Sequence, residues 1–333
     1  MADSAQSSGA LPTTSGIGIE IADSGMRMIA ARVSNGTVAS RRWRRHLPAP
    51  TTPLEALAAL NELIGEIRDE GEQDSKTPAG LGIAFWGEVD AMRGTTRGMP
   101  YAPGWDGFPL AEKLAERWKM ATRLAPAVEA AGLAEARAGA GDQHRVVLYV
   151  HSGRTIASAL IVNGAPVPGA TGRAGKLGHW LVQPDGPRCS CGMRGHLDPI
   201  ASAQSIVRAT IGLASGSDES TAAMLRISGG RAEAMTVRQV VQLASDGDPS
   251  AQTVLADAWD ALALALANLV ATLDPDIIVI GGPPAEAGEA FCGPLRERLA
   301  LLCGSWRPTP DLLPGALEPR AALVGACLLS QPE

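Results

Sequence analysis

Four side chains with the chemistry of metal ligands lie close together in the middle of the chain. They are His179, Cys189, Cys191 and His196. Two thiolates and two imidazoles suit the tetrahedral preference of Zn²⁺, and four protein ligands leave no open position for a reacting water. Three of the four fall within eight residues without helical or strand periodicity, which argues against incidental cysteines and surface histidines. The spacing therefore predicts a structural zinc site.

The residues around these ligands resemble the signature of a known family. The chain reads Gly175-x-x-Gly178-His179, then a gap, then Cys189-x-Cys191-Gly192-x-x-Gly195-His196-Leu197-Asp198. This is similar to the zinc signature of the ROK family of sugar kinases and sugar-responsive repressors, written there as GExGH and CxCGxxGCxE. The likeness extends over nearly the whole chain from Ile17. His196 replaces a cysteine and keeps a ligand, whereas Lys176 and Asp198 replace glutamates at sugar-binding positions.

The resemblance implies an α/β fold of the two-lobed actin-like ATPase (ribonuclease H-like) type, with an interlobe cleft and a zinc-bearing loop at residues 178–198. Residues 1–15 are polar and rich in small side chains, so we expect a flexible tail. A small N-terminal lobe is expected over residues 16–125, closed by the C-terminal helix at 318–333. The larger lobe is expected over residues 126–317.

The phosphate-binding turns of this family are altered in the chain. The first family turn reads Asp-x-Gly-Gly-Thr-Lys, and here only an acidic residue, Glu20, survives. Ala22 and Asp23 replace the glycine pair, and their Cβ atoms and the added negative charge oppose phosphate binding. The second turn keeps only Gly153, and Arg154 either attracts an anion or belongs to a rebuilt turn. The remaining nucleotide-side candidates are Glu20, Gly153, Gly281 and Gly282. We therefore expect weak or absent binding of ATP and Mg²⁺.

The proton acceptor of the family is also missing. The resemblance places Ala127 where the family has the aspartate that takes a proton from the sugar hydroxyl. An alanine methyl cannot accept a proton, and Glu129 lies two residues further on, toward another side of a helix. A sugar-binding asparagine is absent from residues 101–105 as well. The candidate ligand-binding residues are His179, Lys176, Asp198, Glu129 and Arg154.

Three functional hypotheses follow from the surviving scaffold and the altered chemistry. The favoured one is a non-catalytic ROK-fold regulator or accessory protein that binds a sugar-like small molecule or a protein partner. The second is a sugar or aminosugar kinase with a relocated base, for which the candidates are Asp90, Asp106, Glu129 and His151. The third is a ROK-fold enzyme recruited to another reaction.

Composition narrows the class of protein further. The chain has 333 residues, 45% of them hydrophobic, and a formal charge of −6, which argues against a general nucleic-acid surface. Residues 41–46 form a basic run that we interpret as an exposed edge strand, with a phosphate or DNA contact as the alternative. No module for direct DNA binding fits residues 1–15. The cysteine usage indicates a reducing cytoplasm. We expect a homodimer or homotetramer.

Periodicity predicts the elements that must position these residues. The apolar run at 261–273 is interrupted by Asn268 and is too short to cross a bilayer. Strands are expected at residues 17–21, 26–33, 37–44, 81–85, 121–125, 145–151, 156–163 and 276–280. Helices are expected at residues 53–70, 109–118, 127–140, 249–274 and 321–330, with a broken helical region at 200–244.

Overall fold

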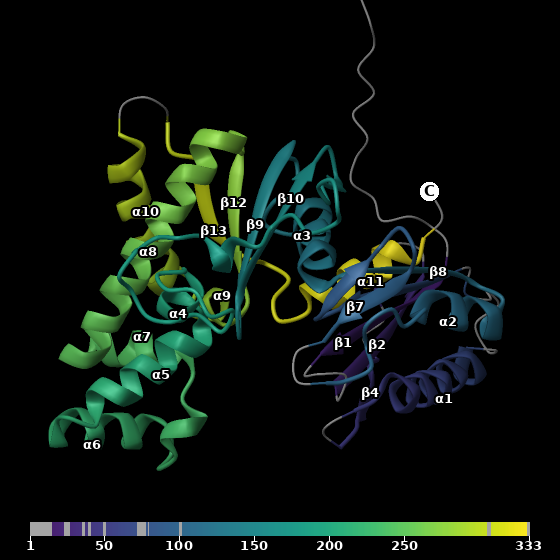
Figure 1. Cartoon of the computed structure of the whole chain (residues 1–333), viewed down its shortest axis with the longest axis horizontal. Helices are drawn as coiled ribbons and strands as arrows, with labels where there is room; N and C mark the ends of the chain where they lie inside the picture. Colours follow the sequence, from purple (N-terminus) through teal and green to yellow (C-terminus); the bar gives the residue numbers. More distant parts are fainter. Residues whose placement is uncertain are drawn as a thin grey trace, which may run out of the picture. The chain divides into compact units, whose positions relative to one another are not determined.

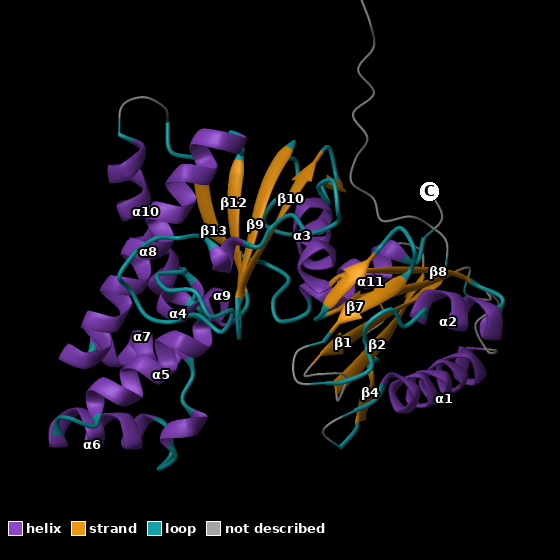
Figure 2. Ribbon diagram, viewed as in Figure 1, coloured by secondary structure: helices purple, strands orange, loops and turns teal. Residues whose placement is uncertain are grey.

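The chain divides into two compact α/β units in a computed structural model. One unit comprises Met1–Gln143, Gly164–Gly172 and Arg320–Glu333, and the other comprises His144–Asn163 and Arg173–Pro319. Figures 1 and 2 show the elements of each. The structure describes residues 15–22, 27–34, 37–38, 41–48, 51–71, 78, 80–99, 102–304 and 308–331. The altered turn at 23–25, the turn at 35–36 and position 101 lie outside these residues. The lobe boundaries given above stay a prediction.

The first unit is built on a mixed sheet in the order β3-β2-β1-β5-β8, with β4 also paired to β2. Its strands are β1 (Gly16–Ala22), β2 (Arg27–Ser34), β3 (Thr37–Val38), β4 (Trp43–His46), β5 (Gly80–Phe85) and β8 (Ala121–Pro126). Its other elements are α1 (Pro53–Gly71), β6 (Glu88–Asp90), β7 (Thr95–Gly98), α2 (Leu110–Trp118), α3 (Ala127–Ala138), β11 (Ala165–Pro166) and α11 (Ala321–Leu329). Because β1, β5 and β8 run parallel, their carboxyl ends share one edge.

Helices cover both faces of this sheet, which explains why β1 is buried along its whole length. On one face α1 places Leu60, Leu63 and Ile67 against the sheet with no exposed surface. On the other face α11 lies so close that a Cβ atom at Gly82 would stand 1.9 Å from the Ala326 carbonyl oxygen. The apolar residues of α1 are therefore buried on one face of the helix, as their spacing predicts. Glycine at position 82 permits the close approach of α11.

The second unit has a sheet in the order β10-β9-β12-β13. Its strands are β9 (Val146–Ser152), β10 (Ile156–Val162), β12 (Ile277–Gly281) and β13 (Asp311–Pro314). Its helices are η2 (Leu177–His179), α4 (Asp198–Ala201), α5 (Ala203–Ala214), α6 (Asp218–Ile227), η3 (Ala232–Ala234), α7 (Val237–Ser245), α8 (Pro249–Leu273), α9 (Pro283–Glu286) and α10 (Glu289–Cys303). One apolar core joins the sheet to the longer helices.

Helix α8 is the core helix of the second unit. It runs for 25 residues from Pro249, so it is longer than the apolar run at 261–273 suggests. By length and composition it could cross a membrane, and among the described residues it is the one helix that meets both conditions. Half of its most apolar window is buried inside the protein, where α8 packs on α5, α7 and α10. That burial is typical of a core helix.

Candidate active site

The carboxyl edge of the first sheet gathers an acidic and an aromatic side chain. The Trp86 backbone N–H donates to the Ile21 carbonyl at 2.9 Å, and its indole N–H donates to Glu20 Oε1 at 2.8 Å. Arg27 Nη2 lies 3.6 Å from the same oxygen, and Glu20 is only 6% exposed. The carboxylate of Glu20 therefore already accepts a hydrogen bond from the Trp86 indole and lies beside the Arg27 guanidinium.

Helix α3 starts at this same edge, directly after β8. Ala127 is its first residue and is 1% exposed. Glu129 stands in the first turn, half-buried, and makes no hydrogen bond or ion pair with any residue that the structure describes. Burial raises the pKa of the Glu129 carboxyl to about 7. At neutral pH this carboxyl therefore exchanges a proton readily, as a general base must.

The other three candidate bases of the kinase hypothesis have less suitable surroundings. Asp90 is bound by Arg97 at 2.7 Å, and these hydrogen bonds hold the pKa of its carboxyl below the usual value. Asp106 is exposed to solvent. Burial lowers the pKa of His151, in the second unit, to about 4. Among the four, Glu129 alone combines partial burial with a near-neutral pKa.

In the second unit, the carboxyl ends of β9 and β12 meet around His151. Gly281 is paired with His151 across the two parallel strands. A Cβ atom at Gly282 would stand 2.9 Å from His151 Cε1, and one at Gly153 would stand 2.8 Å from His151 Nε2. Gly153 and Gly282 are two of the nucleotide-side candidates. Because they have no side chain, they also leave room for the His151 imidazole.

Tyr149 and Glu318 complete this cluster, and neither residue was predicted from the sequence. The Tyr149 hydroxyl donates to Glu318 Oε1 at 2.6 Å and lies 3.4 Å from His151 Nδ1. The two residues are 169 positions apart, and no local pattern connects them.

The two residues that replace family glutamates lie near the metal-ligand loop. Asp198 is 8% exposed and accepts a hydrogen bond from the Ile156 N–H at 2.5 Å. Burial raises the pKa of its carboxyl, and its Oδ1 occupies the space that a side chain at Gly178 would need. Asp198 thus fastens the loop to β10, whereas Lys176 and Arg154 are exposed.

The four expected metal ligands do come together. One ligand atom from each of the residues His179, Cys189, Cys191 and His196 lies within 4.8 Å of the other three. Cys189 Sγ stands 3.7 Å from His179 Nδ1, and Cys191 Sγ stands 3.3 Å from His196 Nδ1. In a tetrahedral zinc site, bonds of about 2.0–2.3 Å place neighbouring ligand atoms roughly 3.3–3.8 Å apart. The geometry and the donor set therefore fit Zn²⁺.

Comparison with known proteins gives a consistent result. The model of the ROK family matches residues 17–333. A glucokinase of Thermotoga maritima is 31% identical over 82% of this chain and 84% of its own, and an N-acetylmannosamine kinase of Shigella boydii is 29% identical over 93% and 96%. The structure of a ROK glucokinase of Streptomyces griseus with glucose and AMPPNP has a TM-score of 0.80 at 27% identity, covering 95% and 99%.

These relatives overturn the favoured interpretation from the sequence. A non-catalytic regulator was inferred from the loss of the base at Ala127 and of the phosphate turns. The curated relatives are kinases, and their similarity extends over most of the chain. The inference was wrong because it treated the altered base position, phosphate turns and sugar contacts as loss of the reaction, although the same helix turn carries the carboxyl of Glu129. The kinase hypothesis agrees better with the relatives.

Proposed function

Because the chain belongs to the ROK family, we propose that it is a sugar kinase, which transfers the γ-phosphoryl group of ATP to a hydroxyl group of a hexose or N-acetylhexosamine. Relatives named glucokinase and N-acetylmannosamine kinase support this class of substrate. The observation that carries the proposal in this chain is Glu129, a half-buried carboxyl at the start of α3 without a partner among the described residues.

Glu129 acts as the general base in this proposal. The sugar hydroxyl gives its proton to the Glu129 carboxylate, the hydroxyl oxygen bonds to the γ-phosphorus, and the bond from that phosphorus to the bridging oxygen breaks to release ADP. A base is most effective when its pKa lies near the working pH, and the pKa of about 7 meets that condition. Ala127, the first residue of α3, contributes only packing.

The phosphate side of the reaction depends on positioning and charge. We propose that exposed Arg154, on the turn between β9 and β10, supplies positive charge to the nucleotide, and that Gly281 and Gly282 let the backbone approach it. Glu20 does not fit a Mg²⁺ site, because its carboxylate already serves Trp86 and Arg27.

Zinc has a structural role in this proposal. The ligands would be His179, Cys189, Cys191 and His196, which close all four positions of the ion. Bound zinc would hold the loop beside Asp198 and supply no reacting water.

An ADP-release assay with glucose, mannose, N-acetylglucosamine and N-acetylmannosamine tests the proposal. We expect turnover with at least one of these sugars, with a kcat that differs from the enzyme median of about 10 s⁻¹ by no more than roughly 30-fold. Each sugar is also measured without protein, and ATP hydrolysis is measured without sugar. If all four sugars remain at background while the protein is folded and zinc-loaded, the proposal is wrong.

A further inference from the structure

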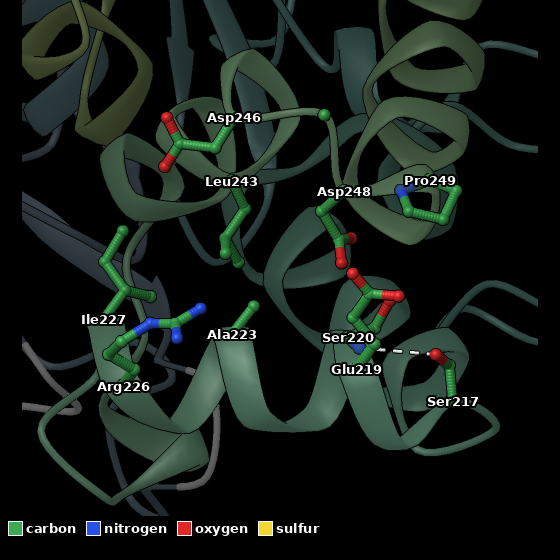
Figure 3. A pocket seen from close by; sticks show the side chains of 11 residues that line it. Ser217, Glu219, Ser220, Ala223, Arg226, Ile227, Leu243, Asp246, Asp248 and Pro249 are labelled. Atoms are coloured by element: carbon green, nitrogen blue, oxygen red, sulfur yellow. Dashed lines mark hydrogen bonds between the residues drawn. The ribbon is translucent and has the colours of Figure 1, made fainter.

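A surface cavity of about 460 Å³ lies in the helical part of the second unit, between α6, α7 and the start of α8. Its size falls within the range of small-molecule sites, about 300–1,000 Å³. The cavity belongs to none of the groups described so far. The residues that line it are Ser217, Glu219, Ser220, Ala223, Arg226, Ile227, Leu243, Asp246, Gly247, Asp248 and Pro249 (Figure 3).

The hydroxyl of Ser220 makes no hydrogen bond to the described part of the protein. Ser220 is only 2% exposed, and its backbone N–H donates to Ser217 Oγ at 3.3 Å. The Ser220 hydroxyl itself makes no hydrogen bond to any residue in the described part of the chain. Its oxygen is not among the fully buried side-chain atoms that lack a partner, so it keeps some contact with solvent. The hydroxyl is therefore ready to bond a ligand in the cavity.

Two charged side chains of the cavity also lack protein partners. Glu219 and Arg226 make no ion pair or hydrogen bond with any described residue. In Figure 3 the Arg226 guanidinium enters from one side, and the carboxylates of Glu219 and Asp248 lie on the other. Asp248 Oδ1 caps α8 by accepting from the Ala251 N–H at 2.8 Å, which leaves its second oxygen for a ligand. Asp246 also lines the cavity, on the same side of the view as Arg226, and its Oδ1 accepts from Gln242 Nε2 at 2.8 Å. The charges without a partner among the described residues are therefore the Arg226 guanidinium on one side and the Glu219 carboxylate on the other.

Apolar side chains also line the cavity, and in Figure 3 Ala223 and Leu243 lie between Arg226 and the carboxylates of Glu219 and Asp248. Ala223, Ile227 and Leu243 line the cavity, and Leu243 is buried in the core of the unit. These apolar side chains favour a hydrocarbon segment of a ligand. The carboxylates favour a cationic group, and the Arg226 guanidinium favours an anionic group. A metal ion alone would contact neither the apolar side chains nor Arg226.

We propose that this cavity binds a small aliphatic zwitterion, with its ammonium group against Glu219, Asp248 and the Ser220 hydroxyl and its anionic group paired with Arg226. The methylene chain of the ligand lies over Ala223, Ile227 and Leu243. This site is independent of phosphoryl transfer, since it uses none of the residues assigned to that reaction.

Calorimetric titration of the whole chain with ω-amino acids, from 4-aminobutyrate to 8-aminooctanoate, tests the proposal without ATP or sugar. We expect one chain length to bind at least about tenfold more tightly than the matching alkylamine and the matching carboxylic acid, which each lack one charge-assisted hydrogen-bond partner. Arg226→Gln should weaken the ω-amino acid by about tenfold and leave the alkylamine unchanged. Glu219→Gln should weaken both.

The matched control is Arg238→Gln, which removes an exposed arginine of α7 that does not line the cavity. It should leave every affinity unchanged. Because Glu219, Arg226 and Arg238 are all exposed, the variants should fold, and equal thermal unfolding midpoints check this. The proposal is overturned if no ω-amino acid binds, if the alkylamine binds equally well, or if Arg226→Gln has no more effect than the control.

Discussion

Substitution of Glu129 by glutamine separates catalysis from stability in one variant. Glutamine keeps the size of the side chain and cannot accept a proton at neutral pH. Loss of a general base lowers the rate by about 10²–10⁴-fold, so we expect kcat/KM for the best sugar to fall by that factor in Glu129→Gln. In the unmodified protein, kcat/KM should rise with pH and level off above the pKa of about 7, because the ionised carboxylate is the active form.

The same variant should be more stable than the unmodified protein above neutral pH. Burial raises the pKa of Glu129 from 4.5 to about 7, so folding favours the protonated form. The stabilising contribution of that proton is complete below pH 4.5 and is lost as the pH rises through 7. At about 1.36 kcal/mol per pH unit, the upper bound is about 3 kcal/mol. Since the side chain is only half-buried, solvent screening reduces the expected gain to about 1–2 kcal/mol at pH 8.

Thermal unfolding at pH 4 and pH 8, together with the ADP-release assay, measures both effects. Glu129→Gln should match the unmodified protein at pH 4 and unfold a few degrees higher at pH 8, since a domain of this size shifts by about 2–4 °C per kcal/mol. Glu116→Gln is the control, because Glu116 is an exposed glutamate on α2. An unchanged pH profile of activity in Glu129→Gln would show that another group accepts the proton. Equal unfolding midpoints at pH 8 would show that the Glu129 carboxyl is not desolvated.

Three further changes have definite expected outcomes. Elemental analysis should find about one zinc per chain, and Cys189→Ser should lose the metal and destabilise the second unit by several kcal/mol, measured by denaturant unfolding. Gly281→Ala should cost roughly 1–3 kcal/mol by thermal unfolding, because its Cβ would stand 2.1 Å from the Tyr149 hydroxyl oxygen, and Tyr149→Phe should recover part of that loss. A double-mutant cycle on Arg45 and Glu66 should give about 0.2–1 kcal/mol that vanishes near 1 M salt.

Much of the fold was predictable because burial follows apolar spacing along the chain. The helix expected at residues 53–70 is α1 (Pro53–Gly71), and the strand expected at 81–85 is β5 (Gly80–Phe85). The single strand expected at 37–44 was wrong. It is divided into β3 and β4, which pair with different parts of β2. Partner choice of this kind depends on the length of a neighbouring strand, which local periodicity does not encode.

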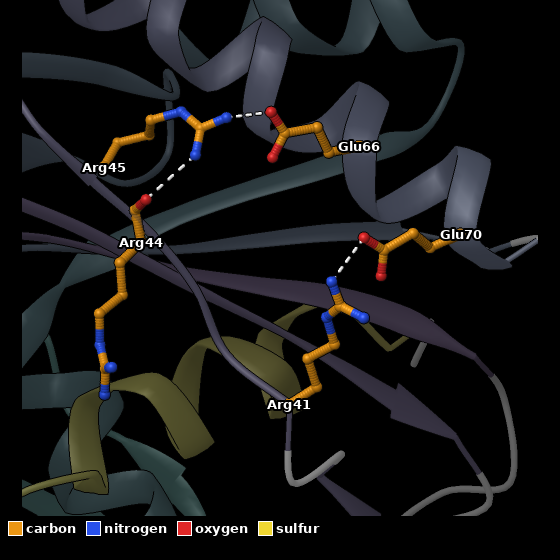
Figure 4. A network of polar contacts seen from close by, with 5 residues as sticks. All are labelled: Arg41, Arg44, Arg45, Glu66 and Glu70. Carbon is orange, nitrogen blue, oxygen red and sulfur yellow. Dashed lines mark hydrogen bonds and ion pairs between the residues drawn. The ribbon is translucent and has the colours of Figure 1, made fainter.

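The basic run shows how contacts that are distant in sequence set the role of a local motif. Figure 4 shows Arg41 and Arg45 reaching Glu70 and Glu66 on α1, while Arg44 extends away from that helix. The interpretation of this run as a strand is confirmed for β4 (Trp43–His46), which pairs with β2. Two of its arginines fasten that strand to α1, a role that depends on acidic residues more than 20 positions away.

The candidate sites were predictable in proportion to how local their chemistry is. The four candidate metal ligands lie within a short stretch of the chain, so their types and spacing were sufficient to predict that they cluster. The protonation of Glu129 depends on burial by the surrounding packing, and the bond from Tyr149 to Glu318 joins β9 to the segment that precedes α11. The zwitterion cavity needs side chains from three helices. Only the folded chain brings these groups together.

The altered phosphate turns of this chain are compatible with its similarity to kinases, because the general base and the positioning of the reacting groups contribute separately to the rate. Phosphoryl transfer depends mainly on holding the reacting groups in line and balancing their charge, and the base contributes only part of the rate. Ala127 and Glu129 occupy the same helix turn, but their side chains leave the helix in different directions. A hydroxyl that gives its proton to Glu129 must therefore approach α3 differently from one served by position 127. For this reason Ala127→Asp in a Glu129→Gln background should restore little activity, because it returns a carboxylate to α3 without moving the sugar toward it.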